Sequence, residues 1–518
     1  MALSPSDLRG ALAFALASFA ALVAGVLLAS PSSVQAVGIV ALLGLVLSLP
    51  LLLSWHRPLL FISWNTAIQA FILPGSPRLW MLMAGISLFL TVLENTIDRR
   101  LRLQNVRAVT GTLLLFLFVV LVTATLRGGI GIKALGSQTY GGKKYVVLIA
   151  AIVGYFALSL VRVPTEKALT YMVGWCLGSL TLAMSNVAYM LGPGFYWLFQ
   201  IFPVEFATEQ ALADSYGGLL RRLSGISFAM VGPFCLMLIR YGIRGTMDWQ
   251  HPWRMLVFLA IIVVSLLGGF RSLLGLYFLL FVFQFSFEGL WGTRYALLLT
   301  GALLLAAIVV VPFASDLPLA MQRSLSFLPI DVNPQARADA EISSEWRFQM
   351  WRLLWAHVPQ YLWLGKGYAL DPMDLYLAQE SHRRGLMENY ETAMISGEFH
   401  SGPLSLLITF GIPGTVTFLA FLVAAWRVVK NNHRYSPPEL KDINTFIHAY
   451  FLCRVCFFFG VYGDVGMDLA YFTGLVGVSV ALNGGVWRPV RAPTPPAAVP
   501  IASTEPLPPP AAPCVSPS

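Results

Sequence analysis

Long apolar runs, each of about 17 to 25 residues, recur along almost the whole chain, and a helix of that length crosses the hydrocarbon core of a bilayer. A soluble fold does not suit this sequence, because 57% of its residues are hydrophobic and only 11% are charged. The pattern therefore predicts an all-α polytopic membrane protein with about 12 to 14 transmembrane helices. The expected spans are residues 11–29, 34–53, 58–74, 78–94, 109–125, 145–161, 168–190, 224–240, 254–269, 271–288, 295–313, 403–425, 443–462 and 466–485.

Two short connections leave the helix count open. The turns at residues 74–77 and 268–271 separate neighbouring apolar runs by only a few residues. In residues 55–95 and 254–288, one long broken helix is therefore the alternative to a pair of spans.

Basic residues orient the chain in the membrane. The net charge of +9 is divided among short clusters between apolar runs, so nucleic acid is not an expected partner. Lysine and arginine concentrate in loops on one side of the alternating spans, with residues 128–144 as the exception, and this side is expected to be cytoplasmic. Both termini fall on it. The four loops contain Arg99, Arg100, Arg102 and Arg107; Arg162 and Lys167; Arg240, Arg244 and Arg254; and Arg427, Lys430 and Arg434.

The same pattern divides the chain into five parts. The expected division is N-terminal transmembrane helices at 1–190, central transmembrane helices with a first outer loop at 191–313, a large extracytoplasmic loop with short helices at 314–402, C-terminal transmembrane helices at 403–485, and a Pro-rich cytoplasmic tail at 486–518. The composition of the tail predicts disorder.

The outer loop at 314–402 is too long to be a passive connection in a compact protein, and loops of that length are usually functional. Within it, Ser343 is expected to N-cap an amphipathic helix with Glu345 in its first turn. This helix should lie along the membrane surface with its tryptophans at headgroup depth. The residues of its predicted inner face are Arg347, Trp351, Leu354 and Val358.

Four polar side chains that are far apart in sequence, Arg222, Arg271, Arg347 and His400, arrive at the outer rim in this topology. Arg271 interrupts a nearly continuous apolar run, where a charge is costly without a partner. Arg222, which stands beside Arg221, could instead anchor a helix end among lipid headgroups, and Arg347 could be an ordinary solvated charge. Their arrival at one rim nevertheless favours a shared site.

His400 is the expected general base of that site. Pro403 suits the first turn of the following helix, so the imidazole should lie near the positive end of a helix dipole, which disfavours its charged form. A neutral imidazole accepts a proton. Glu398 is the alternative base.

Arginine is well suited to a phosphate ligand, because guanidinium groups bind phosphate oxygens in bidentate fashion and stay charged at any accessible pH. Several arginines around one cavity, with no cluster of Asp or Glu to hold a metal ion, indicate a pyrophosphate neutralised by the protein itself. Cys453 and Cys456 have redox-motif spacing, but no second pair or histidine cluster completes a metal site, so no metal is expected.

Four segments resemble the O-antigen ligase and polymerase family, membrane glycosyltransferases with a GT-C-like architecture. The segments are RLSGIS from Arg222, GGFRSLLG around Arg271, WRFQMW from Trp346 followed by LGKGY from Leu364, and HSGPLSLLITFGIPG from His400. Together they cover about residues 200–425. No single segment is specific, and it is their order and spacing that carry the match.

The resemblance implies that Arg222, Arg271 and Arg347 hold the pyrophosphate of an undecaprenyl-linked glycan and that His400 takes the proton from an acceptor sugar hydroxyl. It also implies inversion at the anomeric carbon, without a cofactor, metal ion or nucleotide sugar, at the periplasmic face of the bacterial inner membrane. Supporting roles are expected for Arg221, Trp351, Gly365, Gly367 and Glu398.

Three functions are compatible with these observations. The first is an O-antigen ligase that transfers the glycan to the sugar of a lipid A core, and the second is an O-antigen or exopolysaccharide polymerase of the same family. The third is a transporter or flippase for the lipid-linked saccharide, which would place ionisable groups near the bilayer midplane. The notable polar groups cluster at one rim instead, with the exception of Arg454, which lies inside the span 443–462 and is expected to pair with Asp464 or Asp468.

Overall fold

The computed structural model describes residues 52–97, 103–132, 140–215, 221–384 and 395–488, with single positions at 21, 25 and 137. These residues form helices and no β-strand, apart from two isolated bridges, Gln69 to Arg78 and Tyr140 to Leu370. The all-α fold is therefore confirmed. The expected spans 11–29 and 34–53 and the expected disordered tail lie almost wholly outside the described residues.

Helices long and apolar enough to cross a membrane recur along the described chain. Eight are found there: α3 (Leu79–Ile97), α4 (Arg107–Arg127), α5 (Gly142–Ser159), the segment Thr165–Leu191 that contains α6 (Ala168–Leu177) and α7 (Met184–Leu191), the segment Ser224–Thr246 that contains α9 (Ser224–Ala229) and α10 (Val231–Thr246), α18 (Gly402–Tyr435), the segment Pro438–Gly460 that contains α19 (Lys441–Gly460), and α20 (Val465–Asn483). Three shorter apolar helices are α11 (Pro252–Ser265), α12 (Arg271–Phe287) and α13 (Arg294–Val310). Each corresponds to an expected span.

The expected span at 58–74 is wrong, because the helix there comprises residues 52–63 and the chain then leaves it. Asn65 donates its side-chain amide to the carbonyl of Trp175 at 2.9 Å, and the backbone N–H of Leu79 bonds to the carbonyl of Ile68 at 2.9 Å. These contacts fold the segment back before α3. In contrast, residues 254–288 form two helices, separated at Gly269, whose φ of 71° favours glycine.

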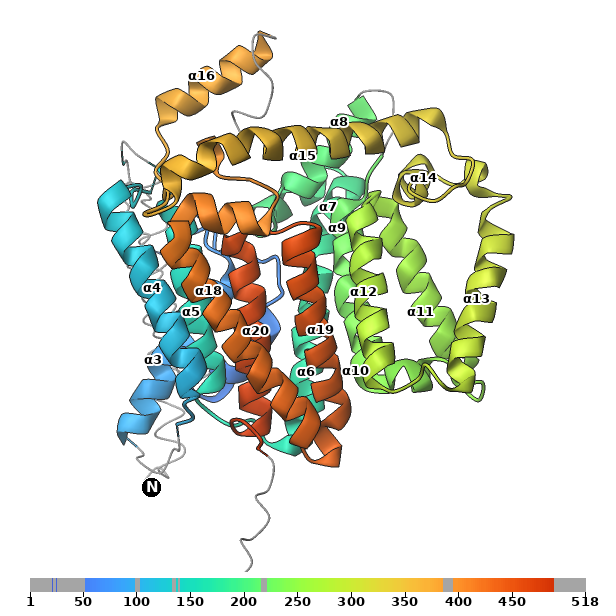
Figure 1. Ribbon diagram of the computed structural model, residues 1–518, viewed down its shortest axis with the longest axis horizontal. Coiled ribbons are helices and arrows are strands. Elements are labelled where there is room, and N and C mark those ends of the chain that lie inside the picture. The colour runs from blue at the N-terminus through green and yellow to red at the C-terminus, as the bar shows by residue number, and fades with distance from the viewer. Residues whose placement is uncertain are drawn as a thin grey trace, which may run out of the picture. The chain divides into compact units, whose positions relative to one another are not determined.

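The C-terminal helices form the best-buried part of the bundle. α20 is almost completely enclosed and packs against α5, α18 and α19, while α18 packs along α4 and α12 packs along α19 (Figure 1). The aromatic side chains of Phe418, Phe458 and Phe472 meet between three of these helices. No residue of α13 is buried, so this helix contributes little to the core.

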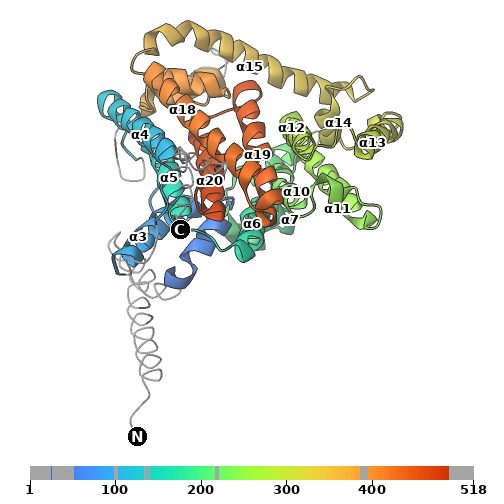
Figure 2. The same cartoon turned by 60° about the horizontal axis from the view of Figure 1, so that its bottom comes forward.

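One helix of the outer loop lies across the ends of the bundle. α15 (Pro334–Tyr361) runs past the ends of α18, α19 and α12 in both views (Figures 1 and 2). Its N-cap is Asn333, whose side chain accepts from the N–H of Gln335 at 2.9 Å. The prediction that Ser343 is the N-cap is therefore wrong, because Ser343 lies well inside the helix.

The predicted inner face of α15 is confirmed from Trp351 onward. Leu354 and Val358 are buried together with Met350, and they pack against α18 through Leu404 and Ile408. The cluster also contains Trp346, Trp351 and Phe399. Apolar burial thus fixes α15 on the start of α18, next to His400. Three further helices, α8 (Glu205–Ser215), α14 (Leu319–Leu325) and α16 (Pro372–Arg383), belong to the two loops at this end.

Candidate functional site

The predicted polar residues lie at one end of the bundle. Arg222 comes two residues before α9, Arg271 is the first residue of α12, and His400 comes two residues before α18. Arg347 belongs to α15, which crosses that end (Figure 1). Elements from four parts of the chain therefore bring these side chains to one region.

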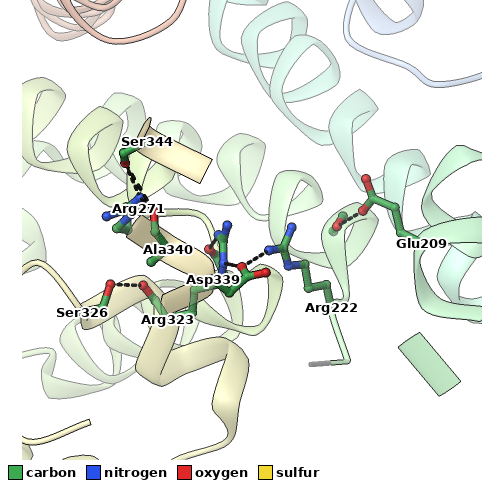
Figure 3. A network of polar contacts seen from close by, with 10 residues as sticks. Glu209, Arg222, Arg271, Arg323, Ser326, Asp339, Ala340 and Ser344 are labelled. Atoms are coloured by element: carbon green, nitrogen blue, oxygen red, sulfur yellow. Dashed lines mark hydrogen bonds and ion pairs between the residues drawn. The ribbon is translucent and has the colours of Figure 1, made fainter. Parts of the chain in front are cut away.

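Asp339 of α15 links two arginines from different elements (Figure 3). Arg222 donates through Nη2 to its carboxylate at 2.8 Å, and Arg323 of α14 donates to the same carboxylate oxygen. Arg323 also donates to the carbonyl of Gly269, in the turn before α12. Because its guanidinium is buried, Arg323 ties α14, α15 and the α11–α12 turn into one unit.

Arg271 bonds to α15 directly. Its Nη2 donates to the carbonyl of Ala340 and to the Ser344 hydroxyl, the latter at 2.8 Å (Figure 3). These partners on α15, the helix that covers the end of the bundle, explain why an arginine can interrupt an apolar run. Since both partners are uncharged, neither of these bonds compensates the positive charge of Arg271.

The arginines of this cluster outnumber the carboxylates that pair with them. Arg222 and Arg323 share the carboxylate of Asp339, and Arg271 bonds to uncharged groups of α15. Glu209 and Glu341 act through their charge on Arg222 and Arg271, respectively. Burial lowers the pKa of Arg222, the nearby charge of Arg323 lowers it further, and Asp339 partly compensates. A bound anion would offset this electrostatic cost, so the cluster has the chemistry of an anion site.

Arg323 was not identified from the sequence. It stands in the outer loop, in the segment MQRSL, and belongs to no recognisable motif. Asp339 and Arg323 acquire their importance only when α14 and α15 come together. The signal that sequence does offer is Asn333 followed by Pro334, an N-cap with proline at the first helical position, which marks where α15 begins.

Arg347 lies between the arginine cluster and His400. It makes no hydrogen bond or ion pair with any residue that the structure describes, although its side chain is half-buried. Burial lowers its pKa, Tyr462 raises it, and the charge of Arg323 lowers it. Its charge also acts on Arg271 and on His400. An anionic ligand can form an ion pair with a half-buried guanidinium that has no carboxylate partner.

His400 adopts a strained backbone conformation, with φ of 49°. Its ring lies edge-on to Trp346, with centroids 5.6 Å apart, and 5.1 Å from the ring of Tyr462. The Nδ1 atom is buried and has no hydrogen-bond partner among the described residues. Strain and unpaired polar atoms persist where function requires them.

The electrostatic surroundings keep the His400 imidazole neutral. Burial lowers its pKa, and the positive charge of Arg347 lowers it further, against smaller opposing effects of Glu398 and Asp464. The expectation that Pro403 stands in the first turn of the next helix is confirmed, since α18 begins at Gly402. His400 is therefore available as a proton acceptor at neutral pH.

Trp351 positions the segment that carries His400. Its Nε1 donates to the carbonyl of Phe399 at 3.0 Å. Phe399 itself is buried against α15 and α18. This hydrogen bond and this burial together fix the backbone immediately before the histidine, which explains how a strained conformation is maintained.

A cavity of about 220 Å³ opens beside His400. It lies between the middle of α15, the start of α18 and the end of α19. The described residues that line it are Trp351, Trp355, His400, Ser401, Pro403, Leu404, Phe458, Phe459, Gly460, Val461 and Tyr462.

Arg221 and Glu398, two of the expected supporting residues, stand apart from the arginine cluster. Arg221 is exposed and faces Asp214 at 3.6 Å, away from Asp339, so the structure favours Arg222 over its neighbour as the inward-facing arginine. Glu398 is exposed and acts on His400 through its charge.

Gly365 and Gly367 form a turn on a break in α18. At Gly411 the helix is interrupted, and Pro413 has no N–H to donate to the carbonyl of Thr409. The N–H of Gly367 donates to that carbonyl instead, at 3.0 Å. Neither glycine lines the cavity beside His400, so their place in the structure is to seat the loop after α15 against α18.

Arg454 pairs with Asp468, one of the two expected partners, and both side chains are buried. Asp468 also accepts from the N–H of Asp464 at 2.9 Å, and Asp464 caps α20. The pair therefore stabilises the α19–α20 connection, which carries Tyr462 to the ring of His400.

A comparison with protein families matches this region. A family model described as O-antigen ligase matches residues 254–419, which contain Arg271, Arg347 and His400 but not Arg222. No match is found among curated proteins. The predicted resemblance to the O-antigen ligase family is therefore confirmed at residues 254–419, about a third of the chain.

Proposed function

We propose that the protein is an inverting glycosyltransferase of the O-antigen ligase type, which moves a glycan from undecaprenyl pyrophosphate to the sugar of a lipid A core at the periplasmic face of the bacterial inner membrane. The observation that carries this proposal is the position of Arg347. Its guanidinium, which pairs with no residue that the structure describes, acts through its charge both on the arginine cluster and on a neutral, partly buried histidine.

In this reaction, Arg347, Arg271 and Arg222 bind the diphosphate of the donor, and Arg323 holds the cluster in place. His400 removes the proton from the acceptor hydroxyl as its oxygen attacks the anomeric carbon. The bond from that carbon to the diphosphate oxygen breaks on the opposite face, which inverts the configuration. Positive charge fixed around the diphosphate stabilises the leaving group as its charge develops.

The first test uses purified protein with lipid-linked glycan and acceptor. We expect product to form in the presence of a chelator, because arginines supply the positive charge. Strict dependence on a divalent ion would contradict a mechanism in which arginines alone neutralise the diphosphate. His400→Ala should abolish turnover and retain donor binding, whereas normal turnover of this variant would exclude His400 as the base.

The second test separates two neighbouring arginines. Arg222→Ala should weaken donor binding, because Arg222 belongs to the cluster around Asp339. Arg221→Ala is the matched control, since Arg221 faces Asp214 instead. Equal donor affinity in the two variants would contradict the assignment of the cluster as the diphosphate site. Arg271→Ala should weaken donor binding as well.

A deletion strain distinguishes ligase from polymerase. If the protein is a ligase, its deletion leaves polymer on the lipid carrier and uncapped lipopolysaccharide in the outer membrane, and this is the expected result. If it is a polymerase, its deletion leaves glycans of a single repeat. The second outcome would be compatible with the proposed roles of His400 and the arginines, but the acceptor would be another carrier-linked glycan.

A further inference from the structure

We infer that the cavity beside His400 binds an uncharged sugar of the acceptor, while the diphosphate of the donor binds to the arginines. This inference rests on the proposed glycosyl transfer and specifies which substrate occupies which part of the site. Its ligand class is a neutral saccharide with free hydroxyl groups.

The arginine region and the cavity lining differ in charge. Trp346 contacts the imidazole ring of His400, and the next residue is Arg347, with Arg271 and Arg323 within its electrostatic reach. The described residues that line the cavity include no Asp, Glu, Lys or Arg, although the charge of Arg347 acts on Tyr462 of that lining. A diphosphate needs the arginines, while a neutral ligand is compatible with the uncharged lining.

The cavity walls are largely aromatic. Trp351 and Trp355 of α15 face the ends of α18 and α19, where Phe458, Phe459 and Tyr462 complete the lining. Flat aromatic rings pack against the apolar C–H faces of sugar rings, and tryptophan and tyrosine combine such a face with a polar group. Trp355 is 57% exposed, so its ring is accessible to a ligand.

Polar groups in the lining favour a saccharide over a lipid chain. The Ser401 hydroxyl, the Tyr462 hydroxyl and the Trp355 indole N–H make no hydrogen bond to any residue in the described ranges. His400 adds a buried Nδ1 without a described partner. A polyisoprenoid tail offers nothing to these groups, whereas sugar hydroxyls both donate and accept. The occupant is therefore a polyhydroxylated ligand.

The location also agrees with the chemistry. A sugar in this cavity touches His400, and the charge of Arg347, one of the arginines proposed to bind the donor diphosphate, acts on the same imidazole. A base that contacts the cavity takes the acceptor proton without displacing the donor.

A binding experiment tests the cavity directly. The full-length protein in nanodiscs is titrated calorimetrically with the dephosphorylated, lipid-free outer-core oligosaccharide of the host lipopolysaccharide. We expect Trp355→Ala to weaken this binding about tenfold, since one aromatic contact is lost, and Trp355→Phe to retain most of the affinity. Trp363→Ala is the matched control, because Trp363 is 80% exposed and does not line the cavity.

Two results would overturn the inference. One is equal oligosaccharide affinity in wild type and Trp355→Ala. The other is a loss of undecaprenyl phosphate binding in Trp355→Ala with oligosaccharide binding unchanged, which would make the cavity a lipid site. Tyr462→Phe, which removes only a hydroxyl, provides a second variant and should weaken oligosaccharide binding without loss of folding.

Kinetics separate this inference from the proposed function. In steady-state transfer, Trp355→Ala should raise the KM for the acceptor and leave the KM for the donor unchanged. Transfer with an unchanged acceptor KM would refute the cavity assignment while the enzymatic function stands. Conversely, if oligosaccharide binding depends on Trp355, the cavity is a saccharide site even if the protein transfers no glycan.

Discussion

At the scale of single residues, burial and the charge of Arg347 both favour the neutral form of His400. Burial lowers the pKa of the imidazole below its ordinary value of 6.5, and Arg347 lowers it further. The base works in its neutral form, which is lost as the pH falls through the lowered pKa. The acidic limb of kcat should therefore lie below pH 6.5 and move to higher pH in Arg347→Gln, because a positive neighbour is removed.

This shift is measured from kcat at saturating donor between pH 4 and 8, so that weaker donor binding does not enter. His357→Gln is a suitable control, since His357 is not among the residues that contact the cluster or line the cavity. An acidic limb that stays in place in Arg347→Gln would show that Arg347 does not act on the general base.

Arg323 leads to a second prediction at this scale. Arg323→Gln removes the group that donates both to Asp339 and to the carbonyl of Gly269. A hydrogen bond from a charged group contributes about 1.5 to 3 kcal/mol, so donor affinity should fall at least about tenfold if these bonds position the cluster. Direct binding of the lipid-linked donor measures the effect. Unchanged affinity would make Arg323 a purely structural residue.

The sequence predicted the residues that stand at helix boundaries. Arg271 interrupts an apolar run, and His400 precedes a proline that begins a helix, so both positions were visible without coordinates. Arg323 and Asp339 were not visible, because each is an ordinary polar residue of a long loop until α14 and α15 meet. Tertiary contacts alone distinguish the buried arginine of that loop from its exposed ones.

At the scale of helices and turns, the apolar runs located the membrane helices from α3 to α20, because bilayer thickness sets their length. The start of α15 was misplaced, since its first turns are polar and carry no apolar periodicity. The break in α18 was also missed, although Gly411 and Pro413 form a Gly-Ile-Pro signal. The sequence stays hydrophobic across Gly411, although the helical backbone is interrupted there.

The turn seated on that break supplies a prediction. Gly365 has φ of 77°, and a Cβ there would approach the carbonyl oxygen of Thr409 to 2.2 Å. Gly365→Ala should therefore displace the loop from α18 and destabilise the protein by about 1 to 3 kcal/mol, visible as a lower thermal midpoint in detergent. Gly111→Ala in α4 is the control, because a Cβ at Gly111 meets nothing within 4 Å. A midpoint lowered equally in both variants would contradict this explanation.

At the scale of the whole molecule, one buried ion pair joins α19 to α20 below the cavity. Removing either partner of the pair between Arg454 and Asp468 leaves an uncompensated buried charge, which costs about 3 to 5 kcal/mol. Arg454→Met and Asp468→Asn should each lower the thermal midpoint strongly. The double variant should recover most of the loss, because no buried charge remains and Asn can still accept from the N–H of Asp464. Additive losses in the double variant would rule out the pair as their cause.

The orientation of the molecule in the membrane is the condition on which the proposed reaction depends. The site and α16 belong to the same end, and Tyr376 of α16 is 60% exposed. Trp249 is 75% exposed in the connection between α10 and α11, beside Arg244 and Arg254. Because basic connections stay in the cytoplasm, we place Trp249 inside and Tyr376 outside.

Single cysteines at these two positions test that orientation, in a variant whose native cysteines are replaced. A membrane-impermeant maleimide applied to intact spheroplasts should label Tyr376→Cys, and Trp249→Cys should react only after permeabilisation. Since both side chains are well exposed, a difference in labelling reports the side of the membrane and not burial. The reverse pattern would place His400 and the arginine cluster on the cytoplasmic face, where a periplasmic acceptor has no access to the base.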